Sequence, residues 1–494
     1  MKQTMKLSIF ATIMSLVSVN AFAHDFAVGG IYYKINENGT SVSVTFKGSS
    51  STQYSNEYYE DIIIPEEVSN KGIKYAVTAI GSDAFYECNE LTSVTIPNSV
   101  TEICATAFYK CVSLSSVTLG NSLIKIDTHA FHNCKKLVSL ELPSTLTEIG
   151  SYAFSDCVRL TSIVIPSNIN VINQGVFYNC EHLQSITIPN SIKVIGRNAF
   201  SGCSSITELT IPDSVEEIGA YAFSSCNSIS MVVIGKNVST IGSSAFDGCD
   251  NIETVYWNSN KYSTPTQSTS MPFYKNESIK TFIFSEGIEK IASHMCYGLS
   301  NLDFVSIPNS VKTIEWAAFS LCSSLRSVTI PNSVSTIGNN AFNVCGLTSI
   351  EIPNSVNSIG PAAFASCPML QKVTIGANVK TIGVQAFSEN KYLYEVTNYS
   401  AIPQQIEANV FAGVDISKCS LYVSEESYNL FIREPVWKDF IVKVAGVEEV
   451  EMDEATKEIE GYYDLKGVRL VEPVRGQVNI VRHTDGTSKK IIIE

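Results

Sequence analysis

The sequence has little of what enzyme sites are usually made from. It holds only 6 histidines in 494 residues, and it contains no glycine-rich phosphate loop, no Gly-x-Ser-x-Gly elbow and no Cys-x-x-Cys pair at metal-binding spacing. Three histidines fall where the chain is expected to turn, and we expect them to be ordinary exposed residues: His129, His132 and His182. The sequence therefore predicts no catalytic site, no metal and no cofactor.

Positive charge is also scarce. The chain has 34 lysine and arginine residues against 48 acidic residues, which gives a formal net charge of −14, and the basic residues form no cluster. Such a chain is a poor partner for nucleic acid or for an anionic membrane surface. After the N-terminus, no apolar run approaches the ~18 residues that a membrane helix needs. We expect no nucleic-acid partner and no membrane span.

Residues 1–23 have the pattern of a secretory signal peptide. Lys2 and Lys6 precede an apolar core, and Ala21-Phe22-Ala23 supplies the small residues of a cleavage site. Cleavage there removes two lysines and no acidic residue, so the net charge becomes −16 (−14 − 2). The next cysteine is Cys88, which argues against a lipoprotein anchor. We predict an exported, soluble monomer that is secreted or held at the cell surface.

The 14 cysteines would ordinarily indicate disulfides in an exported chain. Eight of them recur every 23 residues from Cys88 to Cys249, and Cys322, Cys345 and Cys367 continue the register. In other copies, residues that form no disulfide fill this position: Asn276, Leu299, Asn390 and Val414. A position that accepts leucine faces a core, so we predict buried free thiols. Bridges between adjacent coils remain the alternative, because stacked strands lie about 4.8 Å apart and disulfide Cα distances run from about 4.4 to 6.8 Å.

Each copy has the pattern L-x-x-V-x-I-P-x-S-V-x-x-I-G-x-x-A-F-x-x-C. In the first full copy, Val94-Thr95-Ile96 alternates like a strand with one buried face, and Pro97 ends the strand because proline cannot donate to a ladder. A second short extended segment follows, and in most copies a glycine then takes a position where we expect a left-handed turn. The three-residue spacing from Phe85 to Cys88 predicts a helical turn.

One such unit cannot bury its own apolar face, but a stack of units forms a continuous core. The cysteine register counts fifteen coils from Cys88 to Val414. We therefore predict an α/β solenoid of the leucine-rich repeat class over residues 62–424, with 23-residue coils and a parallel sheet on one face.

The pattern I-P-x-S-V-x-x-I-G-x-x-A-F-x-x-C-x-x-L resembles the BspA-type leucine-rich repeats of exported proteins from Gram-negative oral and gut anaerobes. The resemblance implies a surface or secreted protein that binds host matrix proteins, other bacteria or glycans. It implies no catalysis.

Both ends of the chain leave the repeat. We expect a β-rich N-terminal cap over 24–61 with a hairpin turn at Asn36–Gly39, and a C-terminal cap over 425–446 in which Trp437 and Phe440 plug the last coil. Residues 447–460 are rich in acidic residues and predict a solvated linker.

The last segment, residues 461–494, predicts a small β-rich module. It resembles the C-terminal sorting-type β-domains of the same bacteria, in which Tyr-Asp-Leu-x-Gly begins the module and a lysine-rich strand ends it. Gln477-Val478-Asn479 stands where those modules usually carry a Gly-x-Tyr strand start. A simple interaction module is therefore the alternative to a sorting signal.

Most outward positions of the first strand are serine or threonine, but several middle coils differ. The register also stretches there, from 23 to 27 residues between Cys249 and Asn276, through an insertion near 258–272. An apolar run on a polar exposed sheet is typical of a partner site. We predict one exposed binding stripe, unless the inserted loop covers it, made of Met231, Val233, Tyr256, Ile283 and Phe304.

The expected function is a non-enzymatic scaffold for adhesion to a host matrix protein, a host cell-surface protein or another bacterial surface. The alternative is a glycan-binding or glycan-processing protein that uses the same strand face. A glycosidase needs a pair of converging carboxyl groups. The strand face offers acidic residues only on distant coils: Glu141, Glu208, Glu351 and Glu395. The only aromatic pair for stacking a sugar is Tyr256 with Phe304.

Overall fold

The computed structural model describes residues 23–53, 56–265, 267–446, 459–463, 469–475, 478–483 and 488–492. The predicted signal peptide and most of the predicted acidic linker lie outside the described residues, as do parts of the C-terminal module. The chain divides into two compact units, Met1–Ile206 and Thr207–Glu494, and each contains a stack of repeat coils.

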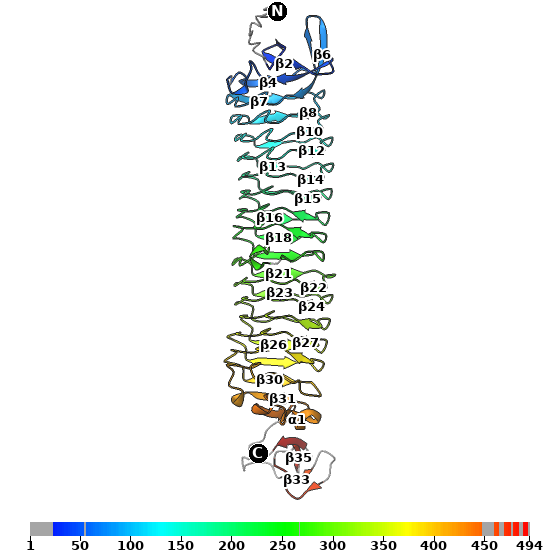
Figure 1. Ribbon diagram of the computed structural model, residues 1–494, viewed down its shortest axis with the longest axis vertical. Helices are drawn as coiled ribbons and strands as arrows, with labels where there is room; N and C mark the ends of the chain where they lie inside the picture. Colours follow the sequence, from blue (N-terminus) through cyan, green and yellow to red (C-terminus); the bar gives the residue numbers. More distant parts are fainter. Residues whose placement is uncertain are drawn as a thin grey trace, which may run out of the picture. The chain divides into compact units, whose positions relative to one another are not determined.

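The first unit begins with an antiparallel sheet that continues into the repeat. β1 (Phe26–Val28), β2 (Ile31–Ile35) and β3 (Ser41–Thr45) form a meander, which confirms the predicted hairpin. β3 then pairs in parallel with β6 (Ile73–Ile80), and β6 also forms a hairpin with β5 (Glu67–Asn70). These strands, blue in Figure 1, therefore cover the first coil by direct strand pairing.

Each coil contributes up to two short strands, and equivalent strands of successive coils pair in parallel, as the stacked arrows of Figure 1 show. We call the sheet built from the Val-x-Ile strands the first sheet and the sheet built from the following Ile-containing strands the second sheet. First-sheet strands of the first unit are β4 (Glu60–Ile63), β7 (Leu91–Thr95), β9 (Ser116–Thr118), β11 (Ser139–Leu140) and β13 (Ser162–Ile163). Its second-sheet strands after β6 are β8 (Glu102–Ile103), β10 (Lys125–Ile126), β12 (Glu148–Ile149), β14 (Val171–Ile172) and β15 (Val194–Ile195).

The second unit repeats this arrangement. Its first sheet contains β16 (Glu208–Thr210), β18 (Met231–Ile234), β20 (Thr254–Trp257), β21 (Thr281–Phe284), β23 (Phe304–Ser306), β26 (Ser349–Ile352), β28 (Lys372–Ile375), β30 (Glu395–Asn398), β31 (Ser420–Val423) and β32 (Ile441–Val444). Its second sheet contains β17 (Glu217–Ile218), β19 (Thr240–Ile241), β22 (Lys290–Ile291), β24 (Thr313–Ile314), β25 (Thr336–Ile337), β27 (Ser358–Ile359) and β29 (Thr381–Ile382). The predicted leucine-rich repeat solenoid is confirmed, and it carries two parallel sheets.

A stack of phenylalanine rings fills the core. Phe85, Phe108 and Phe131 are fully buried, and their ring centroids lie 4.8 and 4.9 Å apart with nearly parallel planes. In the second unit the stack recurs, for example between Phe342 and Phe364, whose centroids lie 5.3 Å apart. Each ring is thus covered by the rings of adjacent coils, which is why one coil is not stable alone.

The cysteine ladder lies beside the phenylalanine stack. All 14 cysteines are free thiols and every cysteine of the register is buried, which confirms the predicted ladder. The Cys111 thiol donates to the backbone carbonyl of Phe85 in the preceding coil, at 3.0 Å. Asn390 fills the same slot, and its side-chain amide donates to the Phe364 carbonyl at 2.9 Å. The slot therefore favours a small side chain that can donate to the coil before it.

The segment predicted as a helical turn is a succession of tight turns. The Cys88 amide donates to the Phe85 carbonyl at 3.2 Å, as a turn requires. However, Asp83 and Glu87 have φ values of 58° and 53°, and residues in this left-handed region interrupt a right-handed helix. The same two positions recur with positive φ in coil after coil. Within the described residues, the one α-helix is α1 (Glu425–Phe431) in the C-terminal cap.

The repeat glycine does not adopt the left-handed conformation that we expected. Its φ is not positive at Gly150, and the reason for glycine is instead the close approach of the preceding coil. A Cβ atom on Gly150 would lie 2.4 Å from the backbone nitrogen of Thr128, which no side chain can tolerate. The left-handed residue comes two positions later, at Tyr152, with φ of 57°. Close stacking of coils therefore selects this glycine.

The C-terminal cap packs two aromatic rings against the last coil. Trp437 is fully buried, and the rings of Trp437 and Phe440 meet the Phe411 ring at centroid distances of 5.7 and 5.1 Å. The Trp437 indole also donates to the Gln404 carbonyl at 2.8 Å.

The described residues also form four short 3-10 helices: η1 (Ser51–Gln53), η2 (Ser268–Ser270), η3 (Ile416–Lys418) and η4 (Trp437–Asp439).

The C-terminal residues form a separate antiparallel sheet, which confirms the predicted small β module. Its strand order is β34-β33-β35-β36. The strands are β33 (Ile459–Tyr463), β34 (Arg469–Leu470), β35 (Val478–His483) and β36 (Ser488–Ile492).

Candidate binding surface

The predicted stripe lies on four strands of the second unit, β18, β20, β21 and β23, which with β16 form one five-stranded part of the first sheet. Successive residues of a strand point to opposite sides of a sheet, so the outward side chains of these strands form two parallel rows. Row one is Glu208, Met231, Thr254, Thr281 and Phe304. Row two is Thr210, Val233, Tyr256, Ile283 and Ser306.

The structure brings together three of the five predicted residues. Val233, Tyr256 and Ile283 are direct neighbours in row two, and each is half-buried. Met231 and Phe304 belong to row one, where Thr254 and Thr281 separate them. The arrangement is therefore an apolar centre in one row flanked by two apolar residues of the other row, in place of a single stripe.

Phe304 is the most exposed of the five, with 54% of its surface accessible. It lies in a different row from Tyr256, and strand β21 separates their two strands. The two rings therefore do not form the adjacent pair on which a sugar could stack.

The described part of the inserted loop does not cover these rows. The Ser259 hydroxyl donates to the Val238 carbonyl at 2.5 Å, and the Ser263 amide donates to the Ser239 carbonyl at 2.9 Å. Val238 and Ser239 lead into β19, so the loop packs at the second sheet. Tyr256 keeps its partial exposure on the first sheet.

An exchange of core residues accompanies the change on the surface. Cys296 occupies the phenylalanine slot of its coil, and its carbonyl accepts the Cys322 thiol at 3.1 Å, as a Phe carbonyl does elsewhere. The smaller residue leaves room for Phe284, whose ring reaches Phe319 at a centroid distance of 6.3 Å. Trp257 is likewise buried, although the equivalent residue is isoleucine in most coils. The sequence signal was Met295-Cys296 in place of Ala-Phe.

Charged residues border the apolar centre. Lys280 and Glu253 precede β21 and β20, and their side chains form an exposed ion pair at 2.7 Å. The hydrogen bond that the Lys280 ammonium donates to the Glu253 carboxylate raises the pKa of Lys280. Glu208 ends row one on the side of β16. An apolar centre with a polar rim has the anatomy of a protein-binding surface.

Sequence reasoning missed a second exposed apolar group near the C-terminal cap. Four side chains are between 47% and 75% exposed: Tyr392, Tyr394, Tyr399 and Ile402. The Lys372 ammonium lies 5.5 Å from the Tyr394 ring centroid and 2.9 Å from the Glu395 carboxylate. The Tyr-x-Tyr pattern before β30 was the available signal.

Two of the three predicted surface histidines are half-buried, and that expectation was wrong for them. His129 stacks on Tyr152 and His132 on Tyr109, with centroid distances of 5.1 and 4.8 Å. Burial lowers the pKa of both imidazoles. The strong inter-coil stacking of turn residues, which periodicity does not reveal, explains the difference. His182 is exposed as expected.

Other functional groups are sparse in the described parts of the chain. No group of three or more His, Cys, Asp or Glu residues there could hold a metal ion. Glu351 and Glu395 lie in different rows of their sheet, with β28 between their strands. Among the helices of the described residues, none has the length and apolar character to cross a membrane.

The stacked coils, the two parallel sheets and the ladders of phenylalanine and cysteine define a leucine-rich repeat solenoid. The family model described as BspA type leucine-rich repeat region (6 copies) matches the sequence over residues 78–207, 195–326 and 312–430. The chain therefore belongs to the BspA-type leucine-rich repeat family. No curated protein matches it significantly.

Solved structures of bacterial leucine-rich repeat proteins are similar to the chain. A leucine-rich repeat protein from Bacteroides ovatus is 25% identical, with a TM-score of 0.51, over 76% of this chain and 94% of that chain. A leucine-rich cell surface protein from Faecalibacterium prausnitzii is 26% identical over the same shares, with a TM-score of 0.37.

Proposed function

We propose that the protein is an exported, non-catalytic scaffold that binds a protein partner through rows one and two of the second unit. The partner is a host matrix protein, a host cell-surface protein or a protein on another bacterial surface. Membership of a repeat family that serves as binding scaffolds supports this proposal. The predicted signal peptide supports export and a secreted or surface-held location.

The observation that carries the proposal is the contiguity of Val233, Tyr256 and Ile283 on an outward sheet face. Serine or threonine fills the equivalent positions in most other coils, for example Thr118 in the first unit. Since the fold is made there with small polar residues, it does not require apolar ones at this place. Exposed apolar side chains lower the solubility of a protein, and a partner that covers them explains why they are present here.

A stacked solenoid offers a preformed surface, so binding orders few side chains or loops and loses little affinity to that cost. The half-buried rings and branched side chains of row two are held by their strand neighbours on both sides. Tyrosine and long apolar residues of this kind carry most of the energy at protein interfaces.

The test begins with the mature chain, residues 24–494, immobilised and exposed to purified matrix proteins, intact bacterial cells and a glycan array. We expect saturable binding to a protein or a cell surface. Binding to glycans alone, unaffected by changes in row two, would replace this proposal with the lectin alternative. The domain boundaries at 61, 424, 446 and 460 can be checked in parallel by limited proteolysis of the same chain.

A further inference from the structure

The second sheet of the second unit is interrupted at the insertion. β22 is the first strand of the sheet β22-β24-β25-β27-β29 and pairs only with β24. The preceding coil, residues 254–276, contributes no second-sheet strand among its described residues. Among the described residues, the Ser263 amide makes the one backward contact of a second-sheet strand there, to the Ser239 carbonyl at 2.9 Å, so the place beside β22 in the succession of second-sheet strands is left unpaired.

The vacant place exposes backbone donors of the next coil. In a regular coil the amides on either side of the strand donate backward: the Lys312 amide donates to the Glu289 carbonyl at 2.7 Å and the Glu315 amide to the Ile291 carbonyl at 2.9 Å. The equivalent amides beside β22 belong to Glu289 and Ala292. Neither has a hydrogen-bond acceptor within the portion of the chain that the structure describes. β22 therefore presents an open parallel edge.

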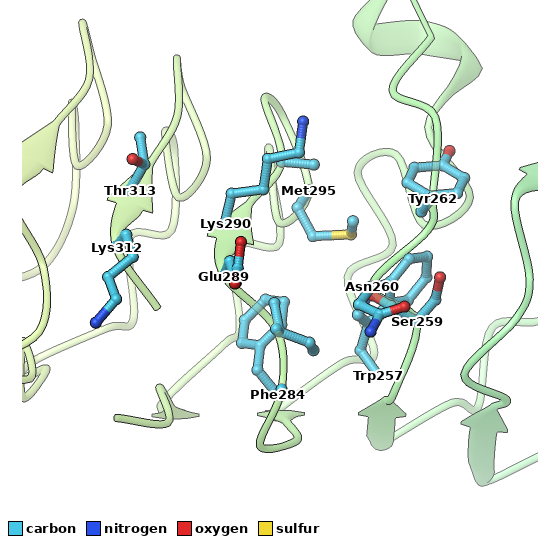
Figure 2. A pocket seen from close by; sticks show the side chains of 13 residues that line it. Trp257, Ser259, Asn260, Tyr262, Phe284, Glu289, Lys290, Met295, Lys312 and Thr313 are labelled. Atoms are coloured by element: carbon cyan, nitrogen blue, oxygen red, sulfur yellow. The ribbon is translucent and has the colours of Figure 1, made fainter. Parts of the chain in front are cut away.

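A cavity of about 470 Å³ lies against this open edge. Figure 2 shows Asn260 and Tyr262 on one side of it, Lys290 and Met295 on the other, and Phe284 with Trp257 along its floor. Phe284 and Met295 are almost fully buried, so the floor is apolar and firmly packed. The volume falls in the range of ordinary ligand pockets.

We propose that this edge binds an extended peptide segment of a partner protein, which adds to β22 as a parallel strand in the vacant place. Its backbone carbonyls accept the amides of Glu289 and Ala292. An apolar side chain enters the cavity over Phe284 and Met295. Main-chain hydrogen bonds supply affinity in this mode of recognition, and the side-chain pocket supplies specificity.

The charge beside the edge indicates one further feature of the segment. Lys290 is the first residue of its strand, as Lys125 is in β10. The Lys125 ammonium lies between carboxylates of both adjacent strands, at 3.4 Å from Glu102 and 3.9 Å from Glu148. Lys290 is in register with Thr313 of β24, and within the described residues its ammonium meets one carboxylate, that of Glu315 just beyond β24, at 3.5 Å. A glutamate in the added strand takes the other side.

Second-sheet segments of the chain itself provide a probe of the required pattern. Residues 144–151, Ser-Thr-Leu-Thr-Glu-Ile-Gly-Ser, place Glu148 at the position beside Lys290 and Ile149 next to it. In the folded protein this segment is built into its own coil, so a second copy does not supply it. A synthetic, fluorescently labelled peptide of this sequence does, and fluorescence polarisation measures its binding to the mature chain.

The charge-reversing variant Lys290→Glu should weaken binding about fivefold at low salt, which corresponds to about 1 kcal/mol. A peptide with Glu148→Lys should restore binding to this variant, because the pair is then reversed on both sides. Lys136→Glu, a charge change at an exposed residue of the first unit, should have no effect. A peptide with Ile149→Ser should lose binding to every form of the protein.

Absence of saturable binding, or equal binding by the Lys290→Glu and Lys136→Glu variants, would overturn the proposal. Amide hydrogen exchange of the peptide-free protein is an independent test. The amides of Glu289 and Ala292 should exchange quickly and become protected when the peptide binds. Slow exchange without peptide would show that the edge is already paired. The site is separate from rows one and two, so its failure leaves the proposed function standing.

Discussion

The thiol of Cys134 donates a hydrogen bond to the backbone carbonyl of Phe108, one coil earlier, at a sulfur–oxygen distance of 3.2 Å. The same contact recurs at Cys157, which donates to the Phe131 carbonyl at 3.2 Å. Each thiol therefore connects two coils without a covalent bond. It is buried, it is directed at a carbonyl, and its neighbours in the ladder are other thiols with the same orientation.

The first prediction concerns the reactivity of these thiols. Mass spectrometry of protein alkylated in denaturant should find the eleven register cysteines free and fully modified. In the native protein they should react very slowly, because burial denies access. Cys104, the only cysteine that is not fully buried, should react first. Recovery of several bridges between neighbouring coils would contradict the ladder of free thiols.

The second prediction is a loss of stability in alkali. Burial raises the pKa of the Cys157 thiol from 9.0 to about 12. The unfolded chain releases this proton as the pH passes 9, whereas the folded chain keeps it. The stabilisation is complete below pH 9 and is lost as the pH rises toward 12, by about 1.4 kcal/mol per pH unit and thiol.

With many such thiols in one ladder, unfolding followed by circular dichroism should occur within about two pH units above 9. Cys157→Val is the matched control, since Val414 occupies the same slot in another coil. The variant should fold at pH 7 and should release one proton fewer when it unfolds in alkali. Stability that stays constant from pH 8 to 11 would show that the thiols ionise freely in the folded state.

The third prediction separates the two faces of a coil. Phe154 is fully buried and stacks on Phe131 and Phe177 at 5.6 and 5.8 Å, so Phe154→Ala should cost about 3–5 kcal/mol of unfolding free energy. Thr118→Ala, on the exposed face of β9, should cost less than about 0.5 kcal/mol. Denaturant unfolding measures both. Similar losses of unfolding free energy for the two variants would mean that the buried and exposed faces of the coil are wrongly assigned.

The fourth prediction uses the left-handed turn before the cysteine slot. Val344 has φ of 57° there, a conformation that is costly for a branched residue, whereas Gly248 fills the equivalent position with φ of 70°. Val344→Gly should raise the unfolding free energy by about 0.5–1 kcal/mol, and Gly248→Val should lower it by about 1–2 kcal/mol. Thermal unfolding of both variants shows whether each substitution raises or lowers the unfolding free energy. If both substitutions raise the unfolding free energy, or both lower it, backbone strain does not determine which residue is favoured at this position.

The repeat core could be predicted because each position recurs in many copies. The burial of Phe154 and the free thiol of Cys134 follow from spacing and from the substitutions that the slots accept. The reason for Gly150 could not be predicted, because the approach of the preceding coil is a contact between residues far apart in the sequence. For the same reason, we expected the left-handed conformation at the repeat glycine, two residues before the position where it occurs.

The site was predicted less well than the core. Residue types indicated an apolar break in a polar sheet, but only strand register assigns Tyr256 and Phe304 to different rows. The 23-residue spacing leaves Cys296 outside the cysteine register, yet its place in the phenylalanine slot appears only from its contacts. The open edge of β22 depends on the path of the insertion, which the pattern of an irregular loop does not determine.

The most direct test of the central claim compares partner binding by the parent protein and by Tyr256→Ser with Ile283→Ser, at equal thermal stability. Surface plasmon resonance against the protein or cell surface captured by the mature chain should show at least a tenfold loss of affinity, about 1.4 kcal/mol, because the apolar centre of row two is removed. Thr254→Ser, a polar change in row one, should bind like the parent, and Phe304→Ser should show a smaller loss. A folded double variant that binds as tightly as the parent would contradict the assignment of the partner site to these rows.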